Sequence, residues 1–434
     1  MKHMRLRRGL AALLSVCLLL PGCANEQRAG PPAQTLPDAP ERIRLGEALL
    51  ATLQQRAGGI HAPDPVLGGY VAGIGETLAR LGEQPWLPWE FVVLNRSAPS
   101  LWALPGGKIA LSRGLLVRLD DEAELAALLA LAIDHALSPA DVGSGRPHAD
   151  GPAPLTAIGT VRDDAAWDQI TLRTGATGTP TPPAGTAEAS AADQSTLARL
   201  ARAGYDPQAL PRLLQRLAGV NTEADWSAGP FAAQPPSSAR AEAAARAAQK
   251  LGAGERGEAR FRERTARLTR DRPAYAIYER GIAAFDAGQN AEALAAAREA
   301  LALQPREALF HELHAVAAAQ LGRPADAFTG LNRAIALNPG FHRPYLLRGL
   351  QHLARGNLEP AGDDLQTANR LLPSEEATLG LAEVARGLGD TAGAGQRYAA
   401  VASGNSVAAA FARERAAQLA GATRADRTRS EPPR

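Results

Sequence analysis

Residues 273–405 repeat a pattern of small residues and prolines at a constant period. Gly288, Gly322 and Gly356 are equally spaced, and Pro305, Pro339 and Pro373 follow them with the same spacing, each halfway to the next glycine position. A glycine permits a turn between two helices, and a proline ends the second helix. Each unit is therefore predicted to be a helix pair that buries its apolar face only against the neighbouring pair.

Further small residues keep the same phase in every unit. Seven residues before each glycine stands a glycine or an alanine, and five residues after it stands an alanine. A generic alanine-rich helix bundle would not keep several residue types at the same position in each unit. Both the pattern and its period of about 34 residues resemble the tetratricopeptide repeat. We expect about four copies over 273–405, a capping helix over 406–421 and a disordered tail over 422–434. The resemblance implies a groove that binds peptides or proteins and carries no chemistry of its own.

The N-terminus resembles a bacterial lipoprotein signal peptide. Basic residues precede a short apolar run that ends in the string LPGC at residues 20–23. The run is too short to span a bilayer comfortably, and a small residue before the cysteine resembles the lipobox. We predict a signal peptide over 1–22, lipidation of Cys23 and a flexible tether over 23–40; an ordinary signal peptide with an incidental cysteine is the alternative. Because Ala24 and not aspartate follows the cysteine, lipoprotein sorting rules imply a lipid anchor on the periplasmic face of the outer membrane.

Composition narrows the possible classes of protein. The chain has 434 residues, two cysteines and a formal net charge of +2. This length allows two or three domains with a sizeable core. The near balance of charge gives no sign of a nucleic-acid surface. One cysteine lies in the signal peptide and the other would carry lipid, so stability must come from packing and not from disulfides.

Residues 41–268 are predicted to form an α+β domain. Apolar residues at helical spacing predict helices over 41–55, 65–82, 113–119, 120–137, 191–219 and 238–268. The strings EFVVLN and KIALS predict strands over 90–95 and 108–112. Residues 138–190 are dense in Gly, Pro, Ser and Thr and predict a long disordered loop.

Two strings in this domain resemble the HtpX-like family of zinc metallopeptidases. They are ALPGGKIALSRGLLVRLDDEAELAALLALAIDHA at 103–136 and AADQSTLARLARAGYDPQALPRLLQRL at 191–217. A periplasmic branch of this family also carries tetratricopeptide repeats after its peptidase domain, so the resemblance covers most of the chain. It implies a mainly α protein, with a zincin-type α+β domain followed by an α-solenoid.

The family's catalytic motif is missing from the matching helix. In the family this helix carries H-E-x-x-H, whose histidines hold zinc and whose glutamate is the general base. Alignment on DEAELAALLA puts these positions at Leu131, Ala132 and His135. The third ligand, a glutamate before an Ala-Asp pair in a later helix, falls on Ala191. Since a catalytic zinc needs three protein ligands, His135 alone cannot hold it, and we predict no intact catalytic residue, no metal and no cofactor.

Other candidate donors do not restore the site. Glu188 lies about one turn before the third-ligand position, and His61 and His148 lie in loop-like contexts. The string HELH at 311–314 has histidines at i and i+3 inside a repeat helix, so a solvated or groove-facing pair is expected there. The family's Thr-His-Pro string corresponds to FAAQPPSSAR, where Gln234 takes the place of the histidine.

One feature of the family's cleft is retained. Active members lay their substrate along the strand that matches PGGKIALS. A peptide-binding strand edge is therefore possible at the start of this string. Its residues are Pro105, Gly106, Gly107, Lys108 and Ile109. An exposed edge of this kind accepts a peptide strand without cutting it.

These observations support a lipid-anchored envelope protein with an inactive metallopeptidase-like domain and a repeat solenoid. It would bind envelope proteins or peptides as a scaffold or chaperone-like factor in assembly or quality control. The first alternative is an active zinc endopeptidase of the same family, which would bind zinc and degrade misassembled envelope proteins. A second is a cell-wall or lipid-trafficking adaptor in which only the repeats matter.

Overall fold

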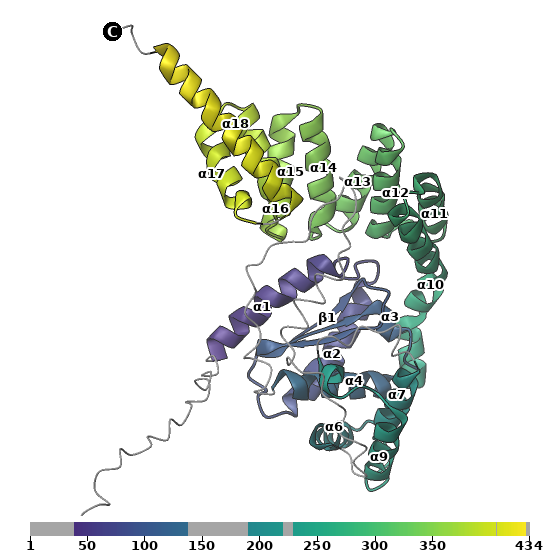
Figure 1. Ribbon diagram of the computed structural model, residues 1–434. Helices are drawn as coiled ribbons and strands as arrows, with labels where there is room; N and C mark the ends of the chain where they lie inside the picture. The colour runs from purple at the N-terminus through teal and green to yellow at the C-terminus, as the bar shows by residue number, and fades with distance from the viewer. Residues whose placement is uncertain (1–38, 138–189, 220–228, 405, 431–434) are drawn as a thin grey trace, which may run out of the picture. The chain divides into compact units, whose positions relative to one another are not determined.

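The computed structural model describes residues 39–137, 190–219, 229–404 and 406–430 (Figure 1). The predicted signal peptide, Cys23 and most of the predicted tether lie outside the described residues. His148, Glu188 and nearly all of the predicted long loop also lie outside them. No described helix is long and apolar enough to cross a bilayer.

The first part of the described chain is an α+β domain, as predicted. Its elements are α1 (Ala39–Arg56), α2 (Pro65–Arg80), β1 (Glu90–Leu94), β2 (Leu101–Leu104), the 3₁₀ turn η1 (Pro105–Gly107), β3 (Lys108–Ser112), α3 (Arg113–Leu116), α4 (Glu122–Ala136), α6 (Ala191–Arg202), α7 (Ala209–Ala218), α8 (Pro230–Ala233) and α9 (Ser238–Ala248). Local chemistry explains several of the boundaries. Asp121 begins α4 by accepting a 2.8 Å hydrogen bond from the backbone N–H of Glu124. Gly204, with φ of 82°, follows the last turn of α6, where only glycine adopts this conformation without strain.

The three strands form one sheet in the order β1-β3-β2. β1 runs parallel to β3, and β2 runs antiparallel to it. Lys108 pairs with Glu90 on one side and with Leu104 on the other, and Ile109 is likewise paired on both sides. β3 is therefore the central strand.

The prediction of an exposed peptide-binding edge at residues 105–109 is wrong. Lys108 and Ile109 already have strand partners on both sides. Pro105, Gly106 and Gly107 form η1, which α1 covers closely: a Cβ on Gly46 would stand 1.8 Å from the carbonyl oxygen of Pro105. The string was expected to be an edge because strand order depends on long-range pairing, which a single sequence does not reveal.

Helix α4 is the centre of this domain. It packs against α2, α6, α7 and the sheet, and its residues are buried except near its C-terminal end. A helix that is apolar all round must be enclosed on every side, and Leu125, Leu128 and Leu129 are accordingly fully buried. The core of the domain is thus the helix that carries Leu131, Ala132 and His135, the positions aligned to H-E-x-x-H and called the vestigial motif below.

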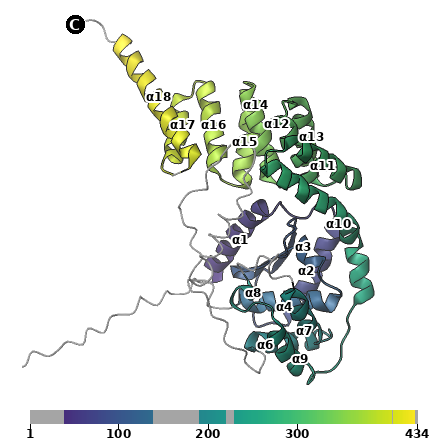
Figure 2. The same ribbon diagram turned by 45° about the vertical axis from the view of Figure 1, so that its right-hand side comes forward.

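The second part is a stack of paired helices, as the constant period of the sequence predicts (Figures 1 and 2). The elements are α10 (Glu258–Asp286), α11 (Asn290–Leu303), α12 (Ala308–Gln320), α13 (Pro324–Leu337), α14 (His342–Ala354), α15 (Leu358–Leu371), α16 (Glu375–Gly387), α17 (Thr391–Ala402) and α18 (Val407–Ser430). Each pair packs on the next. The glycines between the helices of a pair have left-handed backbone conformations, with φ of 75°, 70°, 75° and 83° at Gly288, Gly322, Gly356 and Gly389.

Several boundaries differ from the sequence prediction. The helix predicted over 238–268 is interrupted between α9 and α10. A single helix, α10, runs through Pro273 and joins the first domain to the first repeat, where separate helices were expected. Its buried face continues across the proline from Leu268 to Tyr275, and this packing outweighs the one backbone hydrogen bond that proline removes. At the other end, α18 continues to Ser430, so the prediction of a tail without structure from residue 422 is wrong for 422–430.

A buried polar cluster joins the first domain to the first two repeats. Asn95 donates a 2.9 Å hydrogen bond to Oε1 of Glu307, and the guanidinium of Arg113 lies 3.3 Å from the ring centre of Tyr275. The hydroxyl of Tyr275 lies 3.4 Å from Nδ1 of His61. Burial lowers the pKa of His61, which is 5% exposed. His61 is therefore part of the contact between the first domain and the repeats.

Candidate functional site

The structure places the first-ligand and base positions of the vestigial motif inside the core. Leu131 is 2% exposed and Ala132 is 0% exposed, and both belong to the main apolar cluster of the domain. His135 lies in the last turn of α4 and is half-buried. At these two positions, which align with a zinc ligand and the general base, the side chains are therefore hydrocarbons packed among other hydrocarbons.

The position aligned to the third ligand lies at the start of α6, the helix after the vestigial motif helix in the described chain. Ala191 is the first residue of α6, and α6 packs against α4. Ser190 begins the helix by accepting a 3.2 Å hydrogen bond from the backbone N–H of Asp193. The structure therefore brings the two helices together, but Ala191 has no atom that could bind zinc.

Within the described residues, no group of three His, Cys, Asp or Glu side chains is arranged to hold a metal ion. In the family, zinc would join α4 to α6 through three donors. Here three of the four motif positions are Leu131, Ala132 and Ala191, so the residues present do not fit zinc.

An ion pair joins α4 to α6 beside the vestigial positions. Asp134, the residue before His135, accepts a short hydrogen bond from Nη2 of Arg199 on α6. The other terminal nitrogen of Arg199 donates a 3.1 Å hydrogen bond to the carbonyl oxygen of Leu78 at the end of α2. The side chains of Arg199 and Asp134 are only 7% and 13% exposed. This pair therefore holds three helices together in a poorly solvated place.

The surroundings of the pair fit it closely. The hydroxyl oxygen of Thr196 lies 3.5 Å from a carboxylate oxygen of Asp134. A Cβ on Gly82 would stand 2.7 Å from Nη1 of Arg199, so a residue larger than glycine at position 82 would crowd the guanidinium. Burial raises the pKa of Asp134, and the nearby guanidinium of Arg199 and hydroxyls of Ser195 and Thr196 act against this rise. Sequence analysis missed this pair. The sequence signal for this pair was Asp134 itself, because an aspartate buried in an otherwise apolar helix is costly unless a cation pairs with it.

A second buried ion pair joins α6 to α9. Asp193 is 1% exposed and lies 2.7 Å from Nη2 of Arg240, which also donates to both carboxylate oxygens through Nε. Arg240 also donates to the backbone carbonyl of Gln234, the residue that stands where the family has a histidine. Gln234 thus contributes its backbone to a structural contact.

The acidic N-terminus of α4 is held by tyrosines and arginines. Glu122 accepts hydrogen bonds from the hydroxyls of Tyr70 at 2.7 Å and Tyr205 at 2.9 Å. It also accepts bonds of 2.5 and 2.6 Å from Arg260. Burial alone would raise the pKa of Glu122, but these donors outweigh it and hold the pKa below 4.5. The DEAEL string therefore has a structural role that does not depend on catalysis.

Side chains of the HELH string in α12 contact other residues of the repeats. Nε2 of His311 lies 2.9 Å from the carbonyl oxygen of Pro305, and Glu312 forms a 2.9 Å ion pair with Arg343. Burial lowers the pKa of both His311 and His314. The pair is half-buried, and these contacts explain the string without a metal.

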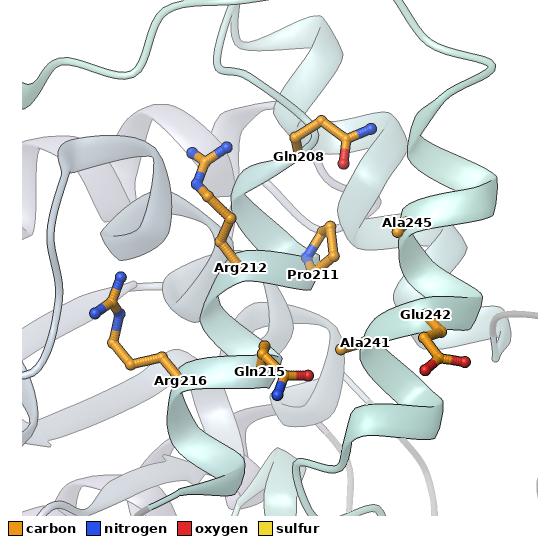
Figure 3. A pocket seen from close by; sticks show the side chains of 8 residues that line it. All are labelled: Gln208, Pro211, Arg212, Gln215, Arg216, Ala241, Glu242 and Ala245. Carbon is orange, nitrogen blue, oxygen red and sulfur yellow. The ribbon is translucent and has the colours of Figure 1, made fainter.

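An open hollow of about 540 Å³ lies between α7 and α9 (Figure 3). Its lining includes Arg212 and Arg216. Arg212 lies 3.2 Å from Asp121, and Arg216 lies 3.3 Å from Glu124, so both cations are already paired with carboxylates at the start of α4. Neither the vestigial motif residues nor a free cation lines this hollow.

Fold and site together define a class of protein. It is an α+β domain built around the buried helix α4, followed by a solenoid of paired helices. Residues 66–138 match the model of peptidase family M48. The chain therefore combines an M48 peptidase-like domain with tetratricopeptide-type repeats, as the sequence predicts.

Two curated relatives match part of the chain. The chain is 28% identical over 235 residues to the beta-barrel assembly-enhancing protease of Yersinia pestis, which covers 48% of this chain and 47% of the relative. It is 27% identical over 189 residues to the protein of the same name from Escherichia coli (strain K12), covering 41% of this chain and 37% of the relative. The matches thus span less than half of the length of these relatives.

Solved structures similar to the chain are repeat proteins. The first tetratricopeptide domain of Spaghetti (RPAP3), bound to an HSP90 peptide, is 28% identical, with a TM-score of 0.27 over 27% of this chain and 95% of that chain. A thermophilic tetratricopeptide protein from Thermus thermophilus is 22% identical, with a TM-score of 0.30 over 37% of this chain and 88% of that chain.

Proposed function

We propose that this chain is an envelope lipoprotein whose M48-like domain is catalytically inactive and whose repeats bind peptides or proteins. It would act as a scaffold or chaperone-like factor in the assembly or quality control of envelope proteins. The single observation that supports inactivity is that Leu131 and Ala132, at the first-ligand and base positions, are buried in the core. Peptide hydrolysis by a zincin needs three zinc donors and a carboxylate to take the proton of the bound water.

The place of action is inferred from the relatives and the N-terminus. The two relatives are named for the enhancement of β-barrel assembly, which supports a role in the envelope. The lipobox-like string at residues 20–23 supports a lipid anchor on the periplasmic face of the outer membrane. The rival function, an active zinc endopeptidase, is favoured by the match to family M48 and by the relatives, which are named proteases.

We expect the purified protein to contain less than about 0.1 zinc per chain and to leave casein uncut, because one imidazole does not retain zinc. Elemental analysis and a casein-cleavage assay with and without a chelator measure both properties. His135→Ala is the matched variant, and it should change neither the metal content nor peptide binding. About one zinc per chain, together with chelator-sensitive cleavage that His135→Ala abolishes, would establish the active endopeptidase instead.

Cys23→Ala is expected to release the protein from the membrane fraction and to abolish incorporation of labelled palmitate. The reason is that the cysteine thiol and the new N-terminal amine are the acylation sites, and two or more acyl chains give stable anchoring. Membrane fractionation and metabolic labelling in a bacterial host test this, with Cys17→Ala as the control that should behave like the natural chain. Equal membrane retention and labelling of the two variants would exclude lipidation at Cys23.

A further inference from the structure

The turn between α2 and β1 presents Trp86, which at 62% is the most exposed large apolar side chain of the described residues. A proline precedes it and another follows two residues later, and each fixes its own backbone φ. The next residue, Leu87, is buried, and its backbone N–H donates a 3.3 Å hydrogen bond to the carbonyl oxygen of Gln84. The indole N–H of Trp89 donates a 3.0 Å bond to the same oxygen. Trp86 therefore projects from a turn of fixed shape.

This turn lies at the end of the M48-like domain where α1 begins. A Cβ on Gly107 of η1 would stand 3.2 Å from the ring of Trp89, so the turn packs on η1. A Cβ on Gly106 of η1 would stand 2.5 Å from the Cα of Ile43 on α1, so η1 packs on the first half of that helix. Because α1 starts at Ala39, the chain enters the domain at the same end as the turn.

The other end of α1 contacts the repeats. Gln55, in its last turn, donates a 2.9 Å hydrogen bond to the carbonyl oxygen of Gly340 and accepts one of 2.9 Å from the backbone N–H of His342. The helix has 18 residues. At 1.5 Å per residue it is about 27 Å long, roughly the width of a small domain. Trp86 and the contact with the repeats therefore lie at opposite ends of the domain.

The composition of the turn indicates the kind of surface that Trp86 fits. Residues 81–90 contain two glutamates and neither lysine nor arginine, so the turn offers no cation to anionic headgroups or to an acidic peptide. One of the two, Glu90, is already paired with Lys108 at 3.2 Å. A tryptophan side chain favours the boundary between headgroups and hydrocarbon, because its ring is apolar and its N–H is polar. The turn therefore fits the interfacial layer of a zwitterionic bilayer.

We propose that Trp86 inserts into the interfacial layer of the bilayer that holds the lipid anchor, as a second membrane contact. This inference rests on the proposed anchor at Cys23 and adds the orientation of the domain on the membrane. Fifteen residues separate Cys23 from Ala39, a span of at most about 55 Å. The anchor thus keeps the turn near the bilayer, where a contact too weak to bind the free protein becomes effective. The repeats, at the other end of the domain, then face away from the bilayer.

The test uses the chain from Cys23 onward, coupled through this sole remaining thiol to a maleimide lipid in phosphatidylcholine vesicles. The coupling supplies an anchor whether or not a cell acylates Cys23. Lipids brominated in the upper part of their acyl chains quench the fluorescence of tryptophans that touch them. Trp86 is one of five tryptophans, so we expect brominated vesicles to lower the total emission by up to about a fifth. Trp86→Phe should abolish this loss.

The matched control is Trp86→Phe/Leu388→Trp, which moves the exposed tryptophan to the end of α16, where Leu388 is 58% exposed. Its emission should not depend on bromination, and thermal melts of both variants verify folding. An emission of the natural chain that bromination leaves unchanged would overturn the proposal and make a protein the partner of Trp86. An equal loss in the double variant would also overturn it, because the contact would not be specific to this end of the domain. Neither result decides the anchor itself, which the Cys23→Ala experiment tests.

Discussion

Arg199→Leu is expected to lower the free energy of unfolding by about 3–5 kcal/mol, the usual loss when one partner of a buried ion pair is removed. The substitution removes the short contact with Asp134 and the 3.1 Å bond to the carbonyl oxygen of Leu78. It leaves the carboxylate of Asp134, whose side chain is 13% exposed, without its guanidinium. Urea unfolding followed by circular dichroism at neutral pH measures the loss.

The double variant Asp134→Ala/Arg199→Leu separates the two contributions. With both charges gone, no buried charge remains, and we expect most of the lost stability to return. Arg202→Leu, an exposed position on the same helix, should change stability by less than about 0.5 kcal/mol. A loss for Arg199→Leu no larger than that for Arg202→Leu would show that the pair does not hold α4 to α6.

Glu122→Ala is expected to cost about 3 kcal/mol of stability at pH 7, because it removes the shared acceptor of Tyr70, Tyr205 and Arg260. Glu122 is 2% exposed, whereas the side chain of Arg260 is 50% exposed and can turn to water. Glu258→Ala is the control. Its side chain is 45% exposed in a pair with Arg256, so its loss should be within about 1 kcal/mol. Equal losses for the two variants would contradict a special role for Glu122.

The same carboxylate predicts the direction of a pH effect. Because the pKa of Glu122 in the folded protein is below 4.5, its contribution is fully present above that pH and is lost as the pH falls through the folded value. Burial raises the pKa values of Glu124 and Asp134, so their contributions to stability change with pH in the direction opposite to that of Glu122. The relevant quantity is therefore the stability difference between the natural chain and Glu122→Gln. It should be constant from pH 7 to about 5 and shrink below about 4.5; a difference that grows on acidification would show that the sign is wrong.

These two sites show how side-chain contacts hold the helices around positions 131, 132 and 191 in place. The buried pairs Asp134–Arg199 and Asp193–Arg240 connect α4 to α6 and α6 to α9. The N-terminus of α4 is fixed independently by Glu122 and its donors. None of these contacts needs a metal ion, so neither addition of zinc nor removal by a chelator is expected to change the stability of the fold.

How far a sequence predicts structure here depends on the range of the interactions. The helix pairs of the repeats were predictable because each repeat contacts only its neighbours and each turn needs a glycine at a fixed place, such as Gly322 with φ of 70°. Strands β1 and β3 were predictable from their β-branched and apolar runs, whereas β2 was not predicted. The strand order was not predictable either, since β3 became central by pairing with β2 and also with β1, which is not its neighbour in the sequence. The continuous helix through Pro273 was likewise set by packing on both sides of the proline.

By itself, the sequence determined which atoms are available at the vestigial motif. The side chains of leucine and alanine at 131, 132 and 191 offer no donor atom to a metal wherever the chain places them. Only the tertiary structure decided what took over at those helices, because Asp134 and Arg199 are 65 residues apart and meet only when α6 packs on α4. It also decided which repeat positions remain uncovered, since burial depends on what the rest of the chain lays over them.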